Sequence, residues 1–275
     1  MKNILFAVCF LILGNQLIWS QKKEDKTRII TLSGAITEIV CSLGFEKQIV
    51  GKDVTSSYPA TLTAKDLGHV RSVSIESVLA LKPTLILASE KDMNPDLATK
   101  LKASGIRIHI LKQELTVQGT KKLITEIATI LEVKNHKDII SKIDKSMSAV
   151  KPLKKAPKVL FVYARGANMM MVSGKDTPVD KMIAIAGGQN AVSGFSDYKP
   201  LTPEALLSAN PDYILFFDSG LKSLGGVKGA LKIDGILKTN AGKNKNIISM
   251  DGALLSGFGP RIGEGASKLN KLLSK

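Results

Sequence analysis

Aromatic residues are scarce in this sequence, and cysteine is almost absent. Phe, Trp and Tyr make up only 5% of the 275 residues, with a single Trp. A surface that stacks the bases of a single-stranded nucleic acid needs several such rings. Zinc-finger, basic-zipper and ribonucleoprotein signatures are also missing. We therefore expect no nucleic-acid partner, although the formal net charge is +15.

The excess of positive charge leaves two interpretations open. The chain has 39 Lys and Arg residues against 24 Asp and Glu residues. Such a surplus attracts anionic partners, including acidic lipids and carboxylated ligands, but it also arises from a lysine-rich surface without a specific partner. The apolar content of 44% is that of a globular protein with a core, and the length suffices for two domains.

The two cysteines bear on where the protein works. Cys9 lies in the apolar run of residues 4–13, which follows the positive charge of Lys2 and predicts a signal peptide over residues 1–20. The run is shorter than the roughly 20 residues that span a bilayer. Without the signal peptide only Cys41 remains, which excludes an intramolecular disulfide and a cysteine-based zinc site. We expect a periplasmic protein with a free Cys41 buried on a helix.

Strand and helix patterns alternate along the rest of the chain. Nearly continuous apolar runs at residues 84–89, 106–111 and 158–163 are typical of parallel strands covered on both faces. Their alternation with helical patterns favours an α/β fold with right-handed crossovers. Apolar residues at helical spacing between lysines predict one long helix near the middle. We expect two Rossmann-like lobes, residues 28–133 and 157–275, joined by that single long helix over residues 134–153, with modest opening and closing.

One segment of the first half recurs in the second half. Glu76 is followed seven residues later by Pro83, and Glu204 is followed seven residues later by Pro211. The two pairs are 128 positions apart. Ser74 and Thr202 precede them as helix caps, and an apolar strand follows each proline. A period of 128 is too long for a solenoid, so the repeat indicates two similar lobes.

The sequence contains three histidines, whose neutral imidazole nitrogens are candidate metal ligands. His109 lies in a predicted strand and His136 starts the predicted linking helix, so the simplest interpretations are a sheet residue and an exposed residue. His69 lies in a polar loop before the capped helix at Ser74, where a side chain can face a cleft or simply lie on the surface. No two histidines have the spacing of a helical zinc site.

Three consecutive methionines follow a glycine in the second half. Met169, Met170 and Met171 are by default packing residues. A thioether is also an axial ligand of haem iron in some proteins, and this run follows the carboxyl end of a predicted strand, where α/β folds bind ligands. The sequence leaves both roles open.

Common catalytic motifs are missing. Gly174-Lys175 lacks the glycine spacing and the hydroxyl of a phosphate-binding loop. Residues 257–263 have one residue too many for a dinucleotide fingerprint and contain Pro260, through which no helix continues. The G-x-S-x-G elbow of hydrolases is absent. We predict a binding protein and not an enzyme.

From Arg28 to its end, the chain resembles the periplasmic binding proteins of bacterial haem importers, within the class that binds cobalamin and siderophores. The matching segments, in chain order, are residues 33–40 (SGAITEIV), 55–59 (TSSYP), 68–71 (GHVR), 172–177 (VSGKDT), 186–192 (AGGQNAV) and 257–261 (GFGPR). The resemblance implies a class III periplasmic binding protein, a monomer that carries haem b to the membrane permease of an ABC importer. Cobalamin or a ferric siderophore is the alternative ligand, and a metal-dependent α/β enzyme is the less favoured alternative.

The resemblance also implies roles for individual residues. In that family a tyrosine in a G-Y-x-[R/K] loop commonly binds the haem iron, and here His69 takes its position, with Arg71 at the basic one. His69 is thus the expected iron ligand, and Tyr58 is its rival. The second ligand of some relatives falls near Arg165, which cannot bind iron, so a neighbouring methionine, taken as Met170, would replace it.

The remaining roles concern charge. Haem propionates need cations, and the resemblance offers four candidates: Arg71, Arg165, Lys199 and Arg261. It further implies that Glu76 and Glu204, one on each lobe, dock onto arginines of the permease. The simpler interpretation is that both glutamates stabilise helix dipoles, and the two roles are compatible.

Overall fold

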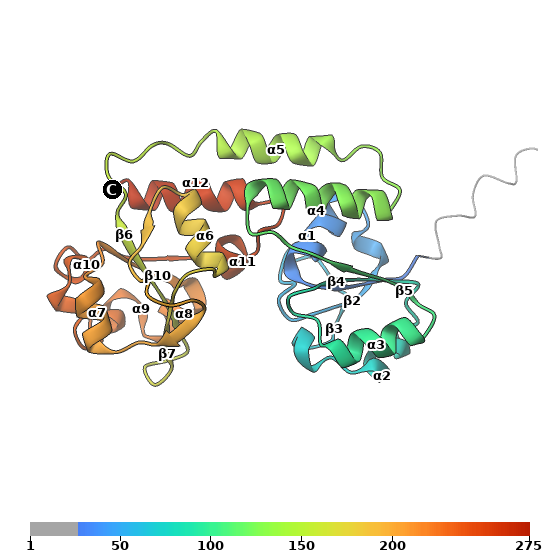
Figure 1. Ribbon diagram of the computed structural model, residues 1–275, viewed down its shortest axis with the longest axis horizontal. Helices are drawn as coiled ribbons and strands as arrows, with labels where there is room; N and C mark the ends of the chain where they lie inside the picture. Colours follow the sequence, from blue (N-terminus) through green and yellow to red (C-terminus); the bar gives the residue numbers. More distant parts are fainter. Residues whose placement is uncertain (1–26) are drawn as a thin grey trace, which may run out of the picture.

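The computed structural model describes residues 27–275. The expected signal peptide, with Cys9, lies outside the described residues. Within them, no helix is both long enough and apolar enough to cross a membrane. Figure 1 shows two lobes side by side, with a layer of helices lying across them along one edge.

The N-terminal lobe contains a five-stranded parallel sheet in the order β3-β2-β1-β4-β5. Its strands are β1 (Ile29–Leu32), β2 (Ile49–Lys52), β3 (Lys65–Asp66), β4 (Leu85–Ser89) and β5 (Arg107–Leu111). Its helices are α1 (Gly34–Ser42), α2 (Ile75–Ala80), α3 (Pro95–Ala103) and α4 (Val117–Ile130). α1 and α4 pack on one face, and α2 and α3 on the other. The central strands β1 and β4 are therefore buried throughout, as their apolar sequences predict.

The C-terminal lobe has a six-stranded mixed sheet. The order is β11-β10-β6-β7-β9, with β8 paired beside the start of β6. Its strands are β6 (Lys158–Ala164), β7 (Met170–Ser173), β8 (Gln189–Asn190), β9 (Tyr198–Pro200), β10 (Tyr213–Phe217) and β11 (Ile247–Met250). Its helices are α6 (Pro178–Ile185), α7 (Pro203–Ala209), α8 (Asp218–Ser223), α9 (Gly226–Ala230), α10 (Asn240–Lys243), α11 (Gly252–Ser256) and α12 (Ile262–Leu273).

The hairpin at β6 and β7 corrects the sequence interpretation. The sequence predicted strands that alternate with helices, but β7 follows β6 directly and pairs antiparallel with β6 and with β9. β7 is only four residues long, and its residues do not alternate between buried and exposed, so it gives no periodicity signal. Met170 and Met171 consequently lie in β7, between β6 and β9, whereas Met169 precedes the strand.

The layer across the two lobes consists of α4, α5 (Lys137–Met147) and α12. α5 packs along α12, which also contacts α4 and α6 (Figure 1). The linking helix α5 is shorter than the expected 134–153, because residues 148–157 cross to β6 without helical structure. Its apolar stripe, including the buried Ile143, faces the rest of the molecule.

One apolar core runs through this layer from lobe to lobe. It joins Ile36 and Ile124 of the first lobe to Phe161 and Met182 of the second, with Phe258 among its buried members. Each sheet has one smaller apolar cluster on its opposite face. The lobes are thus fused along one edge and separate along the other.

The repeat seen in the sequence is also a repeat of local structure. Ser74 accepts a hydrogen bond from the backbone N–H of Ser77 at 3.2 Å, and Thr202 accepts one from Ala205 at 3.1 Å. α2 and α7 are then followed by residues with left-handed backbones, Lys82 (φ 46°) and Asn210 (φ 36°), before the prolines. The two helices accordingly begin and end in the same way on their lobes.

Candidate functional site

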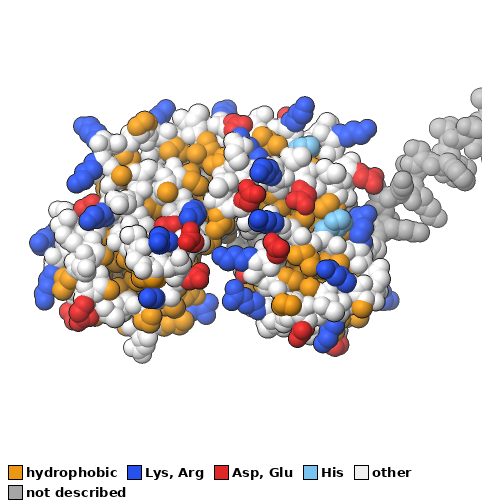
Figure 2. All heavy atoms as spheres, in the orientation of Figure 1, with side chains coloured by type: hydrophobic (Ala, Val, Ile, Leu, Met, Phe, Trp, Pro, Cys, Tyr) orange, Lys and Arg blue, Asp and Glu red, His pale blue; other side chains and the backbone are white. Residues whose placement is uncertain are grey.

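The hollow between the lobes is the place where both halves of the chain can contact one ligand. Figure 2 shows it opening on the side away from α5, with both basic and acidic side chains along its rim. The loops that follow β2 and β3 belong to one lobe, and the loop after β6 belongs to the other. The carboxyl ends of parallel strands are where α/β folds usually bind ligands.

Arg261, Glu38 and Tyr58 form a contact between the lobes. Arg261 precedes α12 and donates hydrogen bonds from Nε and Nη2 to the two carboxylate oxygens of Glu38 on α1, at 3.1 and 2.6 Å. The Tyr58 ring, from the loop after β2, lies 3.6 Å from the guanidinium carbon of Arg261. The side chain of Glu38 is only 7% exposed, whereas Tyr58 is 44% exposed. A guanidinium held by a carboxylate and an aromatic face is strongly oriented.

Burial and the partner's charge shift the pKa of each member of this ion pair in opposite directions. Burial raises the pKa of the Glu38 carboxyl, and the hydrogen bond and charge of Arg261 oppose that change. For Arg261, burial lowers the pKa, but the hydrogen bond and charge of Glu38 outweigh it, so the pKa is raised. The short two-point geometry favours the ionised pair at neutral pH.

The segment around Arg261 is fastened to the first lobe at further points. Gln113 Nε2 donates to the carbonyl of Gly257 at 2.9 Å, and Thr120 Oγ1 donates to the carbonyl of Phe258 at 3.0 Å. At Gly259 an added Cβ would lie 3.2 Å from Glu38 Oε2, so glycine permits the close approach. We call residues 257–261 the interlobe junction.

This junction changes the interpretation of Arg261. The family resemblance suggested Arg261 as a propionate partner, but two of its three guanidinium nitrogens already donate to Glu38. Glu38, Gln113 and Thr120 were not singled out from the sequence. Glu38 did carry a signal, because it is the only charged residue of α1, whose residues from Ala35 to Val40 are all buried. A carboxylate in such a position needs a cationic partner.

His69 lies exposed in the loop after β3. It caps a short 3-10 turn, Val70–Ser72, and its Nδ1 accepts a hydrogen bond from the backbone N–H of Arg71 at 3.3 Å. Among the described residues, none makes a hydrogen bond to its Nε2. Nδ1 thus acts as an acceptor here, whereas metal-binding imidazoles usually donate from the nitrogen that does not bind the metal.

Arg71 stands beside His69 and is also exposed. Its Nη2 lies 3.3 Å from Asp92 Oδ1, and both side chains are largely in solvent. Exposed pairs of this kind contribute about 0–1 kcal/mol, so the guanidinium can exchange Asp92 for a ligand carboxylate at little cost.

The hairpin between β6 and β7 carries Arg165 and the methionines. The backbone N–H of Arg165 donates to the Met169 carbonyl at 2.9 Å, and the Arg165 guanidinium lies 5.6 Å from the centre of the Tyr163 ring. Met169, at the end of the hairpin, is 46% exposed. Met170 is half-buried and packs against an apolar cluster of the C-terminal lobe, and Met171 is half-buried opposite Tyr163. Met169 is therefore the most exposed of the three methionines.

Lys199 lies apart from these residues. It is on β9, with Nζ 4.7 Å from the centre of the Phe195 ring. Both side chains line a cavity of about 510 Å³ beneath α7, within the C-terminal lobe. None of Arg71, Arg165 or Arg261 lines this cavity, so Lys199 lies apart from the other candidate propionate partners.

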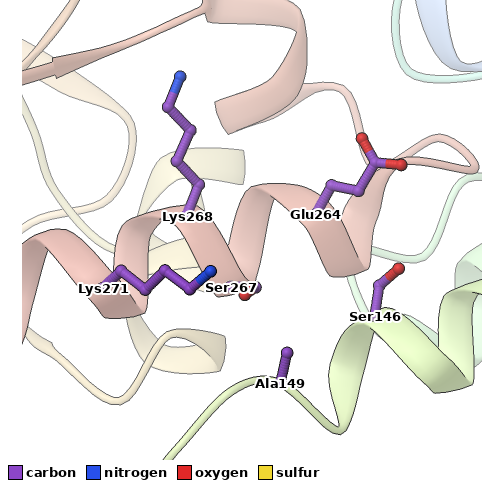
Figure 3. A pocket seen from close by; sticks show the side chains of 6 residues that line it. All are labelled: Ser146, Ala149, Glu264, Ser267, Lys268 and Lys271. Carbon is purple, nitrogen blue, oxygen red and sulfur yellow. The ribbon is translucent and has the colours of Figure 1, made fainter.

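A second cavity, of about 350 Å³, lies in the helical layer. Figure 3 shows it between α5 and α12, where Ser146 and Ala149 face Glu264 and Ser267. It is on the fused edge of the molecule and contains no sequence-predicted site residue.

The other candidates occupy unremarkable positions. His109 is in β5, as expected, and half-buried. His136 was expected to be exposed but is half-buried, because its ring turns toward the Val133 carbonyl, with Nδ1 at 3.4 Å. Cys41 is on α1 as expected but only half-buried, because it lies at the end of the helix. In residues 27–275 no three His, Cys, Asp or Glu side chains form a metal-binding group.

Known proteins resemble this chain over most of its length. The family model described as periplasmic binding protein matches residues 29–254. The uncharacterized ABC transporter substrate-binding lipoprotein YvrC of Bacillus subtilis is 29% identical over 98% of this chain and 86% of its own length. A vitamin B12-binding protein of Vibrio cholerae is 29% identical over 48% of this chain and 45% of its own length.

Solved structures extend the comparison to three dimensions. The periplasmic heme-binding protein RhuT from Roseiflexus sp. RS-1, in apo form, is 34% identical, with a TM-score of 0.85 over 90% of this chain and 98% of that one. The periplasmic heme-binding protein BhuT, in complex with two hemes, is 32% identical, with a TM-score of 0.85 over 90% of this chain and 97% of that one. The similarity covers both lobes and the helical layer between them.

Proposed function

The chain belongs to the periplasmic binding protein family, and from that premise we propose that it binds haem between its lobes and delivers it to an ABC-type permease. The family consists of substrate-binding transport proteins, not enzymes. The observation that carries the proposal is the likeness, across both lobes, to a heme-binding protein that is 34% identical. With the predicted signal peptide, we place the protein in the periplasm.

His69 is the proposed iron ligand. Its Nε2 is open to solvent, and iron binding at Nε2 requires the proton of the neutral ring to be on Nδ1. Nδ1 now accepts a hydrogen bond from Arg71 N–H, so binding replaces that contact. A neutral hydrogen bond contributes about 1 kcal/mol, and the long 3.3 Å distance puts this one toward the lower end. Coordination of haem iron is a stronger interaction, and the exchange is therefore favourable.

Tyr58 remains the rival ligand. Its ring is 44% exposed at the contact between the lobes, but its face lies against Arg261. Using its oxygen for iron would bring the ligand close to the interlobe junction. His69 is preferred because its free nitrogen has no such competing contact.

Two exposed arginines are the proposed propionate partners. Arg71 projects from the first lobe and Arg165 from the second, so each can pair with one carboxylate of a ligand that lies between them. Arg261 is held by Glu38, and Lys199 lies in its own cavity. We therefore rank Arg71 and Arg165 above Arg261 and Lys199.

The docking role of the repeated glutamates belongs to the same proposal. Glu76 and Glu204 are both exposed in the first turn of α2 and α7. Hydrogen bonds from the Glu76 backbone and from Ser74 hold the pKa of the Glu76 carboxyl below its usual value. A charged carboxylate on each lobe is suited to cations on a permease.

A titration of the purified protein with hemin tests the function. We expect a Soret band that shifts on binding, and a shift that is largely lost in His69→Ala. His136→Ala removes the same ring far from the hollow and is the matched control. An unchanged spectrum in His69→Ala would exclude His69 as ligand. Tighter binding of cobalamin or a ferric siderophore than of hemin, in the same assay, would refute haem as the transported ligand.

A further inference from the structure

Large apolar side chains on the surface follow the internal repeat. Among the described residues seven are strongly exposed: Val54, Tyr58, Leu79, Met169, Leu207, Val227 and Leu237. Leu79 and Leu207 are 42% and 40% exposed and differ by 128 positions, the offset of the repeat. A single exposed leucine needs no special cause, but two with the same exposure at equivalent positions do.

Both leucines stand next to the repeated glutamates. Glu76 and Leu79 on α2, and Glu204 and Leu207 on α7, are three residues apart, so they are neighbours on one helix face. The residue before each leucine, Val78 or Leu206, is buried and holds the helix on its lobe. α2 and α7 also have equivalent N-terminal caps, and each is followed by a residue with a left-handed backbone conformation. Both glutamate–leucine pairs therefore lie on helices of the same local structure.

Neither leucine contributes to the apolar cores. Leu79 and Leu207 belong to none of the three clusters and are not among the residues packed against them. Figure 1 shows α2 and α7 in the lower half of the view, one on each lobe, away from the layer of α5 and α12. These two patches are thus free to contact a partner that spans both lobes.

We propose that Leu79 and Leu207 each enter an apolar pocket on one of two equivalent subunits of the permease, next to the cation that pairs with Glu76 or Glu204. A repeated carboxylate–leucine pair matches a partner that presents the same binding element twice. The neighbouring carboxylates disfavour an anionic lipid surface as the occupant. The leucines supply affinity through burial, while the glutamates supply orientation. This inference rests on the proposed delivery to a permease.

Binding of the haem-loaded protein to its permease dimer in lipid nanodiscs tests the inference. Leu79→Gln and Leu207→Gln keep length and helix propensity but remove the apolar surface. Each is expected to weaken docking about fivefold, and the double variant about 25-fold. The haem affinity of all three variants should equal that of the wild type. Leu79→Met should retain docking.

Leu237→Gln is the matched control. Leu237 is 62% exposed on the 3-10 turn Ile236–Lys238, which packs beside α7, but its equivalent 128 positions earlier is the strand residue His109. Its substitution should leave docking unchanged. Wild-type docking by the double variant, or an equal loss in Leu237→Gln, would overturn the inference.

Two further measurements distinguish permease from lipid, and docking from haem binding. Binding of the wild type to nanodiscs without permease, lost in the leucine variants, would assign the leucines to lipid and overturn the proposal. Wild-type protein that docks without haem but fails the hemin titration would refute the proposed ligand and leave the docking inference in force.

Discussion

Arg261 bridges the two lobes through Glu38. Arg261 directly precedes α12 in the second lobe, and Glu38 belongs to α1 in the first. Two hydrogen bonds of 2.6 and 3.1 Å join the guanidinium to the carboxylate. Tyr58 covers the guanidinium at 3.6 Å. Arg261, a candidate propionate partner from the sequence, thus joins the lobes through this ion pair.

Arg261→Ala should destabilise the protein by about 3 kcal/mol, because it leaves the buried Glu38 carboxylate without a partner. The double variant Glu38→Gln with Arg261→Met should lose less, since no charge is then buried alone. Urea unfolding at neutral pH measures both changes in the free energy of unfolding. Equal stability of Arg261→Ala and wild type would show that the ion pair does not hold the junction.

Cys41 should resist thiol reagents in the folded protein. Burial, with smaller effects of the carboxylates of Glu46 and Glu38, raises the pKa of the Cys41 thiol to about 12 from its usual 9.0. The reactive thiolate is therefore rare at about pH 8. Alkylation followed by mass spectrometry should be slow in buffer and fast in urea. Rapid alkylation in buffer would contradict the raised pKa.

The same thiol should make stability fall at high pH. The unfolded chain loses this proton near pH 9.0, while the folded protein keeps it up to about pH 12. Between these values the folded state binds more protons, so the free energy of unfolding decreases as pH rises. Urea unfolding at about pH 8 and pH 10.5 should show a smaller decrease in Cys41→Ala than in the wild type. Identical decreases would remove Cys41 as a cause.

Met169 is the methionine expected to approach haem iron from the second lobe. Met169→Leu should change the ferric and ferrous haem spectra, because it removes the exposed thioether. Met170→Leu, which conserves apolar volume in a packed position, should leave both spectra unchanged. The spectra of the two variants, recorded with the haem Kd, decide between them. No effect of Met169→Leu would mean that methionine does not bind the iron.

Glu76→Ala combined with Glu204→Ala should abolish haem transport into vesicles that contain the permease, with haem affinity intact. Glu126→Ala, which removes an exposed glutamate from α4, is the control for the loss of one such charge and is compared with each single variant, Glu76→Ala and Glu204→Ala. If both glutamates act only on helix dipoles, transport persists and stability falls by roughly 0.3–1 kcal/mol for each. Initial transport rates and unfolding curves distinguish these results.

Much of the fold could be predicted from local signals. The buried strands β4 and β6 appear as apolar runs, and the repeated helices α2 and α7 have a capping hydroxyl at one end and proline beyond the other. These signals depend on residues only a few positions apart, so they can be recognised in the sequence. The short strands β7 and β9 were missed because their identity depends on pairing with neighbours and not on their own pattern.

The candidate site divides in the same way. The sequence by itself determined the α/β architecture, the internal repeat and the position of His69 in a loop before a capped helix, since each follows from local residue patterns. Only the tertiary structure decided that Arg261 pairs with Glu38, 223 positions away, and that Met169 rather than Met170 is exposed. Those outcomes depend on how two lobes meet and on which face of a hairpin is covered, and burial and distance between remote side chains exist only in the folded chain.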